Sequence, residues 1–290
     1  MTSRARILVS GDEKALDAFL RRHADSSLMM LSNLHNAGLA DEGRPYQGTY
    51  FAELDGDQVI GVAAIYWSGA IILQVPGEVG AIADAIRANA PRPVTGILGP
   101  IDQAQRMRAA LGMAGRACML DSTEDLYALA LDRIAVPDAL ARGEVTCRPA
   151  QDDEVDLLIA WRRDFMIESL DAPDDATTTR SSGDLIRRLQ GEGINWVLEH
   201  DGRPVAYATY GARLPDAVQI GGVWTPRDLR RYGYGRAVVA GALLTACQRG
   251  VGRAVLFTDR ANAASAAAYR AIGFTIVGDF ALILFKDNAS

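Results

Sequence analysis

The stretch GGVWTPRDLRRYGYGRAVVAGALLTACQRG at residues 221–250, continued by VLFTD (255–259) and RANAASAAAYRAIGF (260–274), decides the fold of this chain. Its pattern predicts a strand over 218–225, an arginine-rich turn with two glycines, and a helix over 235–249. A second short strand and a second helix follow. A strand that enters a helix through such a turn predicts a site for a phosphate-bearing ligand.

The residue types in the turn suit a diphosphate. Gly233 and Gly235 have no Cβ, so a ligand can approach the backbone N–H groups there. The helix that follows adds about half a positive charge at its start. Four arginines surround the turn, although the chain has a net charge of −6, and the sequence offers only Asp228 nearby to oppose them. These arginines are Arg227, Arg230, Arg231 and Arg236.

The turn also resembles other phosphate-binding motifs in part. Gly233, Gly235 and Asp259 partly imitate the GxGxxG fingerprint of dinucleotide-binding folds, but the first glycine lies too far from the strand, and Val238 stands at the third glycine position. The GxxxxGK[ST] phosphate loop is absent. A solvated arginine-rich turn without a ligand is the other alternative.

The motifs resemble those of the GNAT acetyltransferase superfamily. GVWT (222–225) and RRYGYGRA (230–237) are similar to its fourth strand and its [Q/R]xxGx[G/A] pyrophosphate loop, and LFTDRANAASAAAYRAIGF (256–274) is similar to its fifth strand, its Asn and its YxxxGF helix. The resemblance is closest to a branch in which a degenerate amino-terminal half precedes an active half. It implies an α/β fold of two tandem domains, each a mostly antiparallel mixed sheet with helices on both faces.

The resemblance also implies the cofactor and its site. The cofactor would be acetyl-coenzyme A, with no metal, and its pantetheine arm would lie where the fourth and fifth strands of the second domain diverge. The implied cofactor-binding residues are Val223, Trp224, Thr225, Arg230, Arg231, Tyr232, Gly233, Tyr234, Gly235, Arg236, Asn262 and Ser265.

Tyr269 is the first candidate for catalysis. A phenol with a pKa of about 10 can donate a proton to a leaving thiolate whose conjugate acid has a pKa of about 8.5, and the family's matching Tyr has that role. The alternative for Tyr269 is a core aromatic. The general base is less clear, because the strand AVQIGGVWT (217–225) has no carboxylate. Glu168 and Asp259 are the candidate bases, with Glu199 as a further possibility, and each has the alternative of a structural or solvated acid.

An internal repeat predicts the two domains. FAELDGDQVIGVAAIY (51–66) and VLEHDGRPVAYATY (197–210) each read as a hairpin with an Asp-Gly turn, and each follows a strand and helical segments, which are 13–36 in the first half and 153–169 in the second. We expect domains at 1–135 and 144–290. In the first half, PGEVGAIADAI (76–86) has a shortened turn, no arginine and Glu78 where phosphate oxygens would lie, so we expect no cofactor there.

Composition limits the class of protein. The chain has 290 residues, about half of them apolar, and a pI of about 5.2, which argues against general nucleic-acid binding. No run suits a membrane span or a signal peptide, so we expect a cytoplasmic protein. The three cysteines (118, 147 and 247) and three histidines (23, 35 and 200) lack metal-ligand spacing. We expect buried free thiols and a solvent-exposed His200.

The sequence therefore predicts a GNAT-type N-acetyltransferase in which an amine attacks the acyl thioester directly, as a monomer or homodimer. The acceptor would be a small amine or a protein amino group. Glu168, Asp171, Asp174 and Asp175 either attract a cationic amine or form a solvated acidic loop between residues 171 and 184. The alternative functions are a non-catalytic sensor of coenzyme A and an interaction scaffold.

Overall fold

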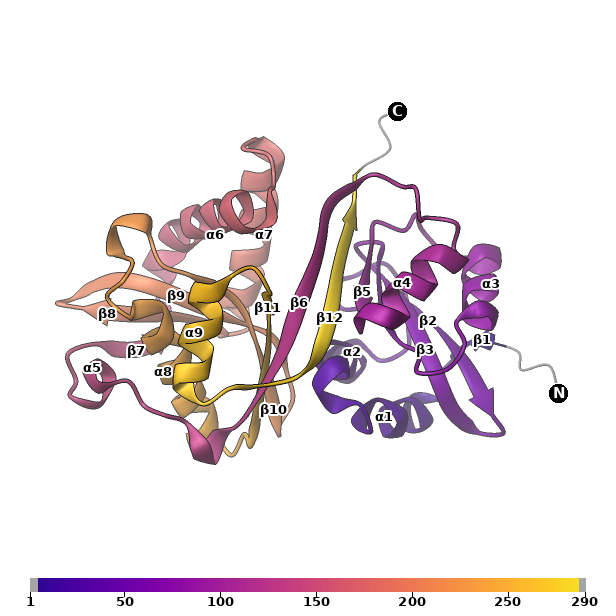
Figure 1. The fold of residues 1–290 in the computed structure, drawn as a ribbon, viewed down its shortest axis with the longest axis horizontal. Coiled ribbons are helices and arrows are strands. Elements are labelled where there is room, and N and C mark those ends of the chain that lie inside the picture. Colours follow the sequence, from indigo (N-terminus) through magenta and orange to yellow (C-terminus); the bar gives the residue numbers. More distant parts are fainter. Residues whose placement is uncertain (1–4, 287–290) are drawn as a thin grey trace. The chain divides into compact units, whose positions relative to one another are not determined.

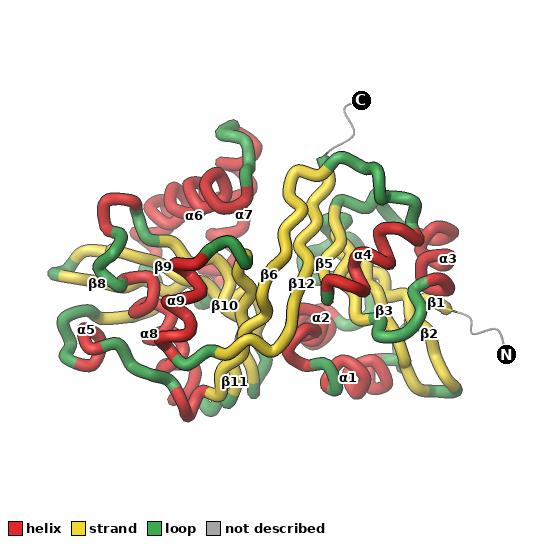
Figure 2. Tube along the Cα trace, in the orientation of Figure 1, coloured by secondary structure: helices red, strands yellow, loops and turns green. Residues whose placement is uncertain are grey.

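The computed structural model describes residues 5–286 and divides the chain into two compact units. Unit 1 contains the residues up to Leu126 together with those from Val277 onward, and unit 2 runs from Tyr127 to Ile276. The chain passes twice through the same succession of elements, namely strand, two helices, three strands, helix, strand, helix and strand (Figures 1 and 2). This repetition confirms the prediction of two tandem domains of one α/β fold.

Unit 1 is an antiparallel sheet with one parallel pair. Its strand order is β1-β2-β3-β4-β5-β12, and only β4 and β5 are parallel neighbours among them. The elements of this part of the chain are β1 (Ala5–Ile7), α1 (Glu13–Arg21), α2 (Ala24–Ala37), β2 (Gly48–Asp55), β3 (Gln58–Tyr66), β4 (Ala70–Gln74), α3 (Gly80–Asn89), β5 (Gly96–Gly99), α4 (Ile101–Ala110) and β6 (Cys118–Ala130).

Helices cover both faces of the sheet in unit 1. Alternate residues of a strand point to opposite faces, and on β4 Leu73 belongs to the apolar core under α3 and α4. The next residue, Gln74, accepts a hydrogen bond from Ser26 Oγ at the start of α2 (2.7 Å), so α2 lies on the other face.

Unit 2 repeats this arrangement. Its strand order is β6-β11-β10-β9-β8-β7, with β10 and β11 parallel and the hairpin strands antiparallel. The elements are η1 (Leu131–Arg133), α5 (Asp138–Ala141), β7 (Thr146–Pro149), η2 (Asp152–Glu154), α6 (Val155–Leu170), α7 (Ala176–Gly191), β8 (Asn195–His200), β9 (Arg203–Arg213), β10 (Ala217–Trp224), η3 (Arg227–Leu229), α8 (Tyr234–Gln248), β11 (Arg253–Asp259), α9 (Ala263–Ile272) and β12 (Thr275–Phe285).

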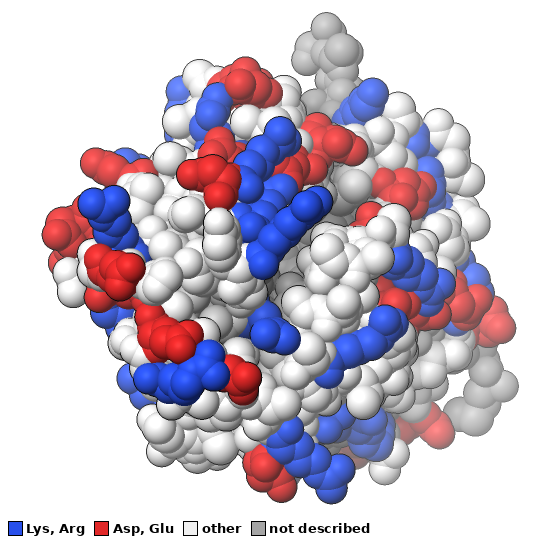
Figure 3. Space-filling view, turned by 60° about the vertical axis from the view of Figure 1, so that its left-hand side comes forward, with Lys and Arg blue, Asp and Glu red and all other residues white. Residues whose placement is uncertain are grey.

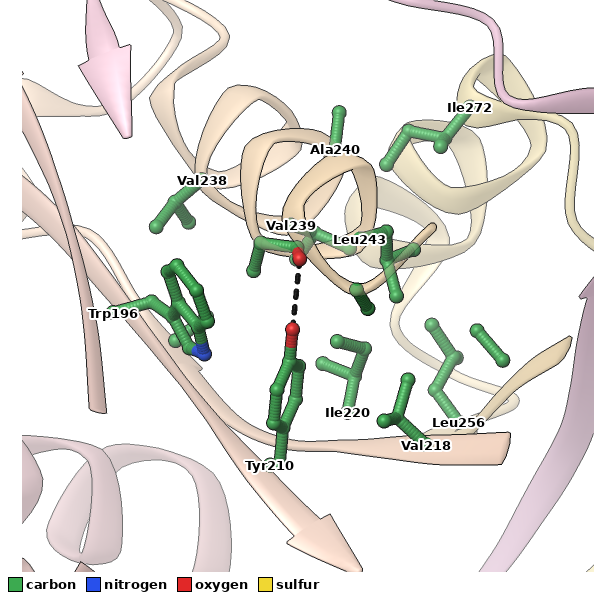
Figure 4. Packing of buried hydrophobic residues seen from close by; sticks show 14 of the residues in the cluster. Trp196, Tyr210, Val218, Ile220, Val238, Val239, Ala240, Leu243, Leu256 and Ile272 are labelled. Carbon is green, nitrogen blue, oxygen red and sulfur yellow. Dashed lines mark hydrogen bonds between the residues drawn. The ribbon is translucent and has the colours of Figure 1, made fainter. Parts of the chain in front are cut away.

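The larger core of unit 2 lies between the sheet and α8. The side chains of Val238, Val239 and Leu243 pack on Ile220 and Trp196 from the sheet (Figure 4). In the same core the Tyr210 hydroxyl donates to the carbonyl oxygen of Ala242 at 2.7 Å, so this buried phenol has a partner. On the opposite face α6 and α7 cover a second cluster of six buried residues, which are Leu158, Trp161, Ile186, Val197, Tyr207 and Trp224.

Two strands pass from one unit to the other. β6 follows the helices of unit 1 along the chain, yet its neighbour in unit 2 is β11. β12 follows α9, and its residues Ala281 to Leu284 pair antiparallel with β5 of unit 1. The expected limits of 1–135 and 144–290 differ from the compact units for this reason, since a contiguous split cannot assign the last strand to the first domain.

Two local predictions were wrong. The helical segment 13–36 is two helices, α1 and α2, which are separated at Arg22 and His23. The segment 171–184 is not an acidic loop, because α7 begins at Ala176 and the Asp175 carboxylate accepts a hydrogen bond from the N–H of Thr178 (2.8 Å). An N-cap of this kind stabilises the start of a helix, and the polar composition of the segment gave no sign of that helix.

Candidate functional site

The parallel pair β10 and β11 separates along its length. The two strands are in register over Ala217–Gln219 and Arg253–Val255, and that register ends there although both strands continue. Beyond it, Val223 and Trp224 pair on their other side with Ala208 and Tyr207 of β9. The edge of β10 that faces β11 is therefore available to an extended ligand arm, which would add to the sheet as a strand does.

A glycine pair bends β10 at the point where the strands separate. The register with β9 shifts between Ile220 and Val223, so β10 holds one more residue than β9 over this span. Gly221 and Gly222 occupy the bulge. A Cβ on Gly221 would lie 2.7 Å from Thr209 Oγ1, and a Cβ on Gly222 would lie 2.8 Å from the NH1 nitrogen of Arg162. Only glycine fits at these two positions without a shift of its neighbours.

The turn from Thr225 to Gly233 ends in a helix start that no side chain caps. Gly233 has a φ of 81° and is the N-cap of α8, and the first helical bond runs from Ala237 N–H to Gly233 O. The N–H groups at the start of an α-helix have no intrahelical acceptor, so those before Ala237 can serve a ligand. Arg231 has a φ of 72°, a conformation that a side chain of its size rarely adopts.

The four arginines of the turn fall into two pairs, which corrects the prediction that only Asp228 opposes them. Glu168 on α6 accepts from Arg227 Nε (2.7 Å) and lies 2.6 Å from the NH1 nitrogen of Arg230. Arg230 also donates from Nε to the carbonyl oxygen of Thr225 (3.0 Å), and its guanidinium lies 4.7 Å from the centre of the Trp224 ring. Arg227 and Arg230 thus hold the turn in place through contacts within the protein.

Arg231 and Arg236 form the second pair. Within residues 5–286, neither has an ion pair with a carboxylate, and the buried Nε of Arg236 has no hydrogen-bond partner. Acidic and basic side chains are otherwise interspersed over the face that Figure 3 shows. An unpaired guanidinium with a buried N–H beside an uncapped helix start fits a phosphate oxygen.

The two tyrosines of the turn differ in their surroundings. Tyr232 is 70% exposed and its ring stacks on that of Tyr234 at 5.6 Å. The Tyr234 hydroxyl is 2.6 Å from Nδ1 of His200. His200 therefore supports the first residue of α8, a role that its place beside an Asp-Gly turn did not indicate.

A cavity of about 370 Å³ adjoins the turn. One wall is Tyr232 to Tyr234 with Arg236 and Ala237, and the other is the segment from Ala135 to Ala139 with Arg142. Ligand pockets have volumes of roughly 300–1,000 Å³, so this one can take part of a nucleotide. From the sequence, residues 136–143 were expected only to separate the two domains, and no part in a ligand pocket was predicted for them.

The residues at the end of β11 form a capped turn. The Asn262 side-chain oxygen accepts from the Ser265 N–H (3.0 Å) and caps α9, so its Nδ2 group remains to donate to a ligand. Asp259 accepts from the N–H of Ala261 (2.8 Å) and is exposed. The sequence allowed Asp259 to be either a structural acid or a base, and this hydrogen bond is a structural contact.

Each candidate base already has a partner. The guanidinium of Arg230, followed in effect by that of Arg227, lowers the pKa of Glu168. Glu199 pairs with Arg148 at 2.9 Å. A carboxylate that is held as an anion accepts a proton poorly at neutral pH.

Tyr269 lies in α9 and is 9% exposed. Its ring is 6.0 Å from that of Phe274 and 6.3 Å from that of Tyr127, both in the core under α8 and α9. These ring contacts are those of a core aromatic, and a role for its hydroxyl in proton transfer stays a prediction.

The corresponding turn of unit 1 has a different character. Only residues 75–79 separate β4 from α3, whereas residues 225–233 separate β10 from α8. Arg106 of α4 donates to the carbonyl oxygen of Gly77 (2.6 Å), and Gln103 accepts from the N–H of Val75 (2.5 Å). Side chains of unit 1 itself thus bind this turn, and the absence of a cofactor there stays a prediction.

Comparison with known proteins gives the class. Residues 155–274 match the model of the acetyltransferase (GNAT) family. This part of the chain belongs to that family, and the whole chain has the fold of tandem GNAT proteins. The sequence prediction of the superfamily and of its two-domain form is confirmed.

Three solved structures illustrate the fold. A Drosophila protein has a TM-score of 0.71 at 12% identity, over 99% of this chain and all of that one. A tandem GNAT protein from the clavulanic acid biosynthesis pathway has a TM-score of 0.59 at 14% identity, with 99% of each chain covered. A GNAT-family acetyltransferase from Colwellia psychrerythraea has a TM-score of 0.56 at 16% identity, over 98% of this chain and all of that one. No curated protein matches the chain.

Residues 5–286 show neither a membrane-spanning helix nor a metal-binding cluster. Every helix in this range is too short or too polar to cross a lipid bilayer. No cluster of three or more His, Cys, Asp and Glu side chains is arranged to hold a metal ion in the same range.

Proposed function

We propose that unit 2 transfers an acetyl or other short acyl group from coenzyme A to an amine. The observation that carries this proposal is the turn before α8, where an uncapped helix start stands beside Arg231 and Arg236, neither of which has an acidic partner in the described chain. Several N–H donors directed at one diphosphate contribute on the order of 1.5–3 kcal/mol each when the acceptor is charged.

The rest of the cofactor has a place along the same path. The adenosine end fits the cavity beside Tyr232 and Arg236, and the pantetheine arm fits the edge of β10 at Val223 and Trp224. The Nδ2 group of Asn262 would donate to that arm from the end of β11. When bound, the cofactor supplies an acyl thioester, which is activated toward attack by an amine.

Two proton transfers accompany the reaction, one to the leaving sulfur and one from the acceptor amine. Tyr269 would donate its hydroxyl proton toward the leaving sulfur, as a phenol can for a thiolate of lower basicity. Glu168, Glu199 and Asp259 have the partners described above, so we infer that the acceptor amine enters as the free base or loses its proton to water.

A thiol-release assay with acetyl-CoA and a panel of amines tests the transferase function. We expect turnover with at least one amine, and Tyr269→Phe should lower kcat about 10²-fold while the affinity for coenzyme A persists. Tyr127→Phe is the matched control, because that buried hydroxyl touches the same cluster and has no hydrogen-bond partner in the described chain. If kcat falls equally in the two variants, the hydroxyl of Tyr269 has no role in the reaction and Tyr269 is a packing residue.

A non-catalytic sensor of coenzyme A is the second candidate. The observation that favours it is that all three candidate bases have structural partners. It predicts tight binding of coenzyme A in calorimetry and no thiol release with any amine, whereas an interaction scaffold predicts no binding.

A further inference from the structure

A charged group without an acidic partner stands at the bulge of β10, on the sheet face that α6 and α7 cover. Arg162 projects from α6, and its NH1 nitrogen lies 2.8 Å from the point where Gly222 would carry a Cβ. Its Nε is buried without a hydrogen-bond partner, and no carboxylate of the described chain pairs with it. Arg162 is half-buried, and a buried N–H without an acceptor costs free energy, so a ligand that accepts from it would be favoured.

Polar side chains gather around this guanidinium. The Tyr207 hydroxyl lies 3.4 Å from the same point above Gly222. Tyr207 is fully buried, its hydroxyl is in hydrogen-bonding contact with the Arg162 guanidinium, and the hydroxyl proton has no acceptor within residues 5–286. The indole N–H of Trp224, which is 6% exposed, also lacks a partner there. Three donors with unmet hydrogen bonds therefore come from α6, β9 and β10, beside one glycine bulge.

The two glycines of the bulge let polar groups of the α6 face approach the strand closely. Gly221 and Gly222 are consecutive, yet a Cβ on each would meet groups of the α6 face, namely Thr209 and Tyr207 with Arg162. Neither position could carry a side chain unless these groups moved. The bulge begins where β10 and β11 lose their register, which is where the thioester would lie under the proposed function.

Three of the four acidic residues that could attract a cation have partners within the described chain. Arg163 pairs with Asp174, Asp175 caps α7, and Glu168 pairs with the two arginines of the turn. The charge that remains at the bulge is positive. This charge favours an anionic group on the acceptor, beside the amine that the transfer itself requires.

We propose that the acceptor is a small aminocarboxylate, such as an amino acid, whose carboxylate binds Arg162 and the Tyr207 hydroxyl while its amine points to the gap between β10 and β11. This inference rests on the proposed function and specifies its substrate class. A planar guanidinium with a phenol beside it matches the two oxygens of a carboxylate, and the amide or decarboxylated form of the same molecule would leave these donors unmet.

The test compares matched acceptors. Each of the twenty amino acids is assayed beside its carboxamide and, where it exists, its decarboxylated amine, by thiol release from acetyl-CoA. We expect at least one acid to exceed its amide in kcat/KM by 50-fold or more. In Arg162→Gln the KM for that acid should rise about 100-fold with kcat within a few fold, so the acid-to-amide ratio falls to about one. Arg163→Gln, the neighbouring arginine on α6, should keep the ratio.

A second variant guards against misfolding of Arg162→Gln. Tyr207→Phe removes a hydroxyl whose proton has no acceptor in the described chain, so its thermal stability should change little, and we expect its KM for the acid to rise 5- to 10-fold. The inference is overturned if amides and amines are used as well as the acids, or if Arg162→Gln slows all acceptors alike. Should no acceptor be turned over, the transferase function fails separately. In that case, calorimetry measures the affinity of the protein for the same acids and amides with coenzyme A present. Equal affinity for acids and amides overturns the anion site, whereas binding of acids that is lost in Arg162→Gln supports it.

Discussion

Glu168 connects α6 to the turn that precedes α8. Its two oxygens contact Arg227 and Arg230, and Arg230 in turn contacts Thr225 and Trp224, so one carboxylate fixes the entry to the turn. The same contacts lower its pKa, with Arg230 as the largest cause. We therefore propose that Glu168 positions the cofactor turn instead of acting as the base, the role for which the sequence made it a candidate.

Glu168→Gln separates these two roles. Loss of a general base lowers kcat by about 10²–10⁴-fold, whereas loss of a positioning contact alters mainly the affinity for the cofactor. We expect kcat to fall less than tenfold and the KM for acetyl-CoA to rise several fold, as steady-state kinetics with both substrates varied would show. A kcat loss of 10³-fold at unchanged KM would restore Glu168 as the base.

At the scale of elements, the junction of β7 and α6 places the helix that carries Arg162 and Glu168. Arg148 of β7 binds both oxygens of Glu154 at 2.7 and 2.8 Å and also contacts Glu199 of β8. Glu154 in turn accepts from the N–H of Gln151 (2.7 Å) in a capping box. This network sets where α6 begins over the sheet.

Glu154→Gln should destabilise unit 2 in a pH-dependent way. Arg148, as the largest cause, lowers the pKa of Glu154 below its ordinary 4.5. A lowered carboxyl pKa gives stability that is present above the ordinary value and lost as the pH falls through the lowered one. Urea unfolding at pH 7 should show a loss of about 1–3 kcal/mol, which shrinks toward zero in acid.

Asp164→Asn, at a half-exposed site on the same helix, is the control and should change stability little at either pH. A loss for Glu154→Gln that is the same at pH 7 and in acid would show that the ion pair is not its cause.

Sequence periodicity predicted the elements best where local chemistry is strong. The strand before the cofactor turn and α8 lie within one residue of the expected positions, and the hairpins with Asp-Gly turns lie within three residues. The start of α7 was missed because its cap, Asp175, stands in a polar run without an apolar stripe. Arg162 and Tyr207 were missed because only the pairing of β9 with the bulged β10 and the packing of α6 bring them together.

At the scale of the whole molecule, each unit takes its last strand from a distant part of the chain. Ile283 of β12 is fully buried in the core of unit 1, opposite Ile97 of β5, although 266–276 just before it belong to unit 2. No local pattern shows where a terminal strand pairs, so the sequence assigned it to the second domain.

Ile283→Ala tests this assignment. Such a core truncation costs about 2–5 kcal/mol, and we expect the loss in unit 1. Hydrogen exchange should show weaker protection of amides in β2 to β5, with those of β8 to β10 and the affinity for coenzyme A unchanged. Ile276→Ala, at a position that is 47% exposed, should alter neither set. Loss of protection in unit 2 alone would contradict the assignment of β12.

The most direct test of the cofactor site is calorimetric titration of the protein with coenzyme A. For Arg231→Glu combined with Arg236→Glu, the account predicts an affinity at least tenfold weaker with the fold intact by circular dichroism. Arg180→Glu combined with Arg203→Glu makes the same change in net charge at exposed sites of unit 2 and should bind as the unaltered protein does. Equal affinity in the two double variants would contradict the claim that the turn before α8 holds the diphosphate.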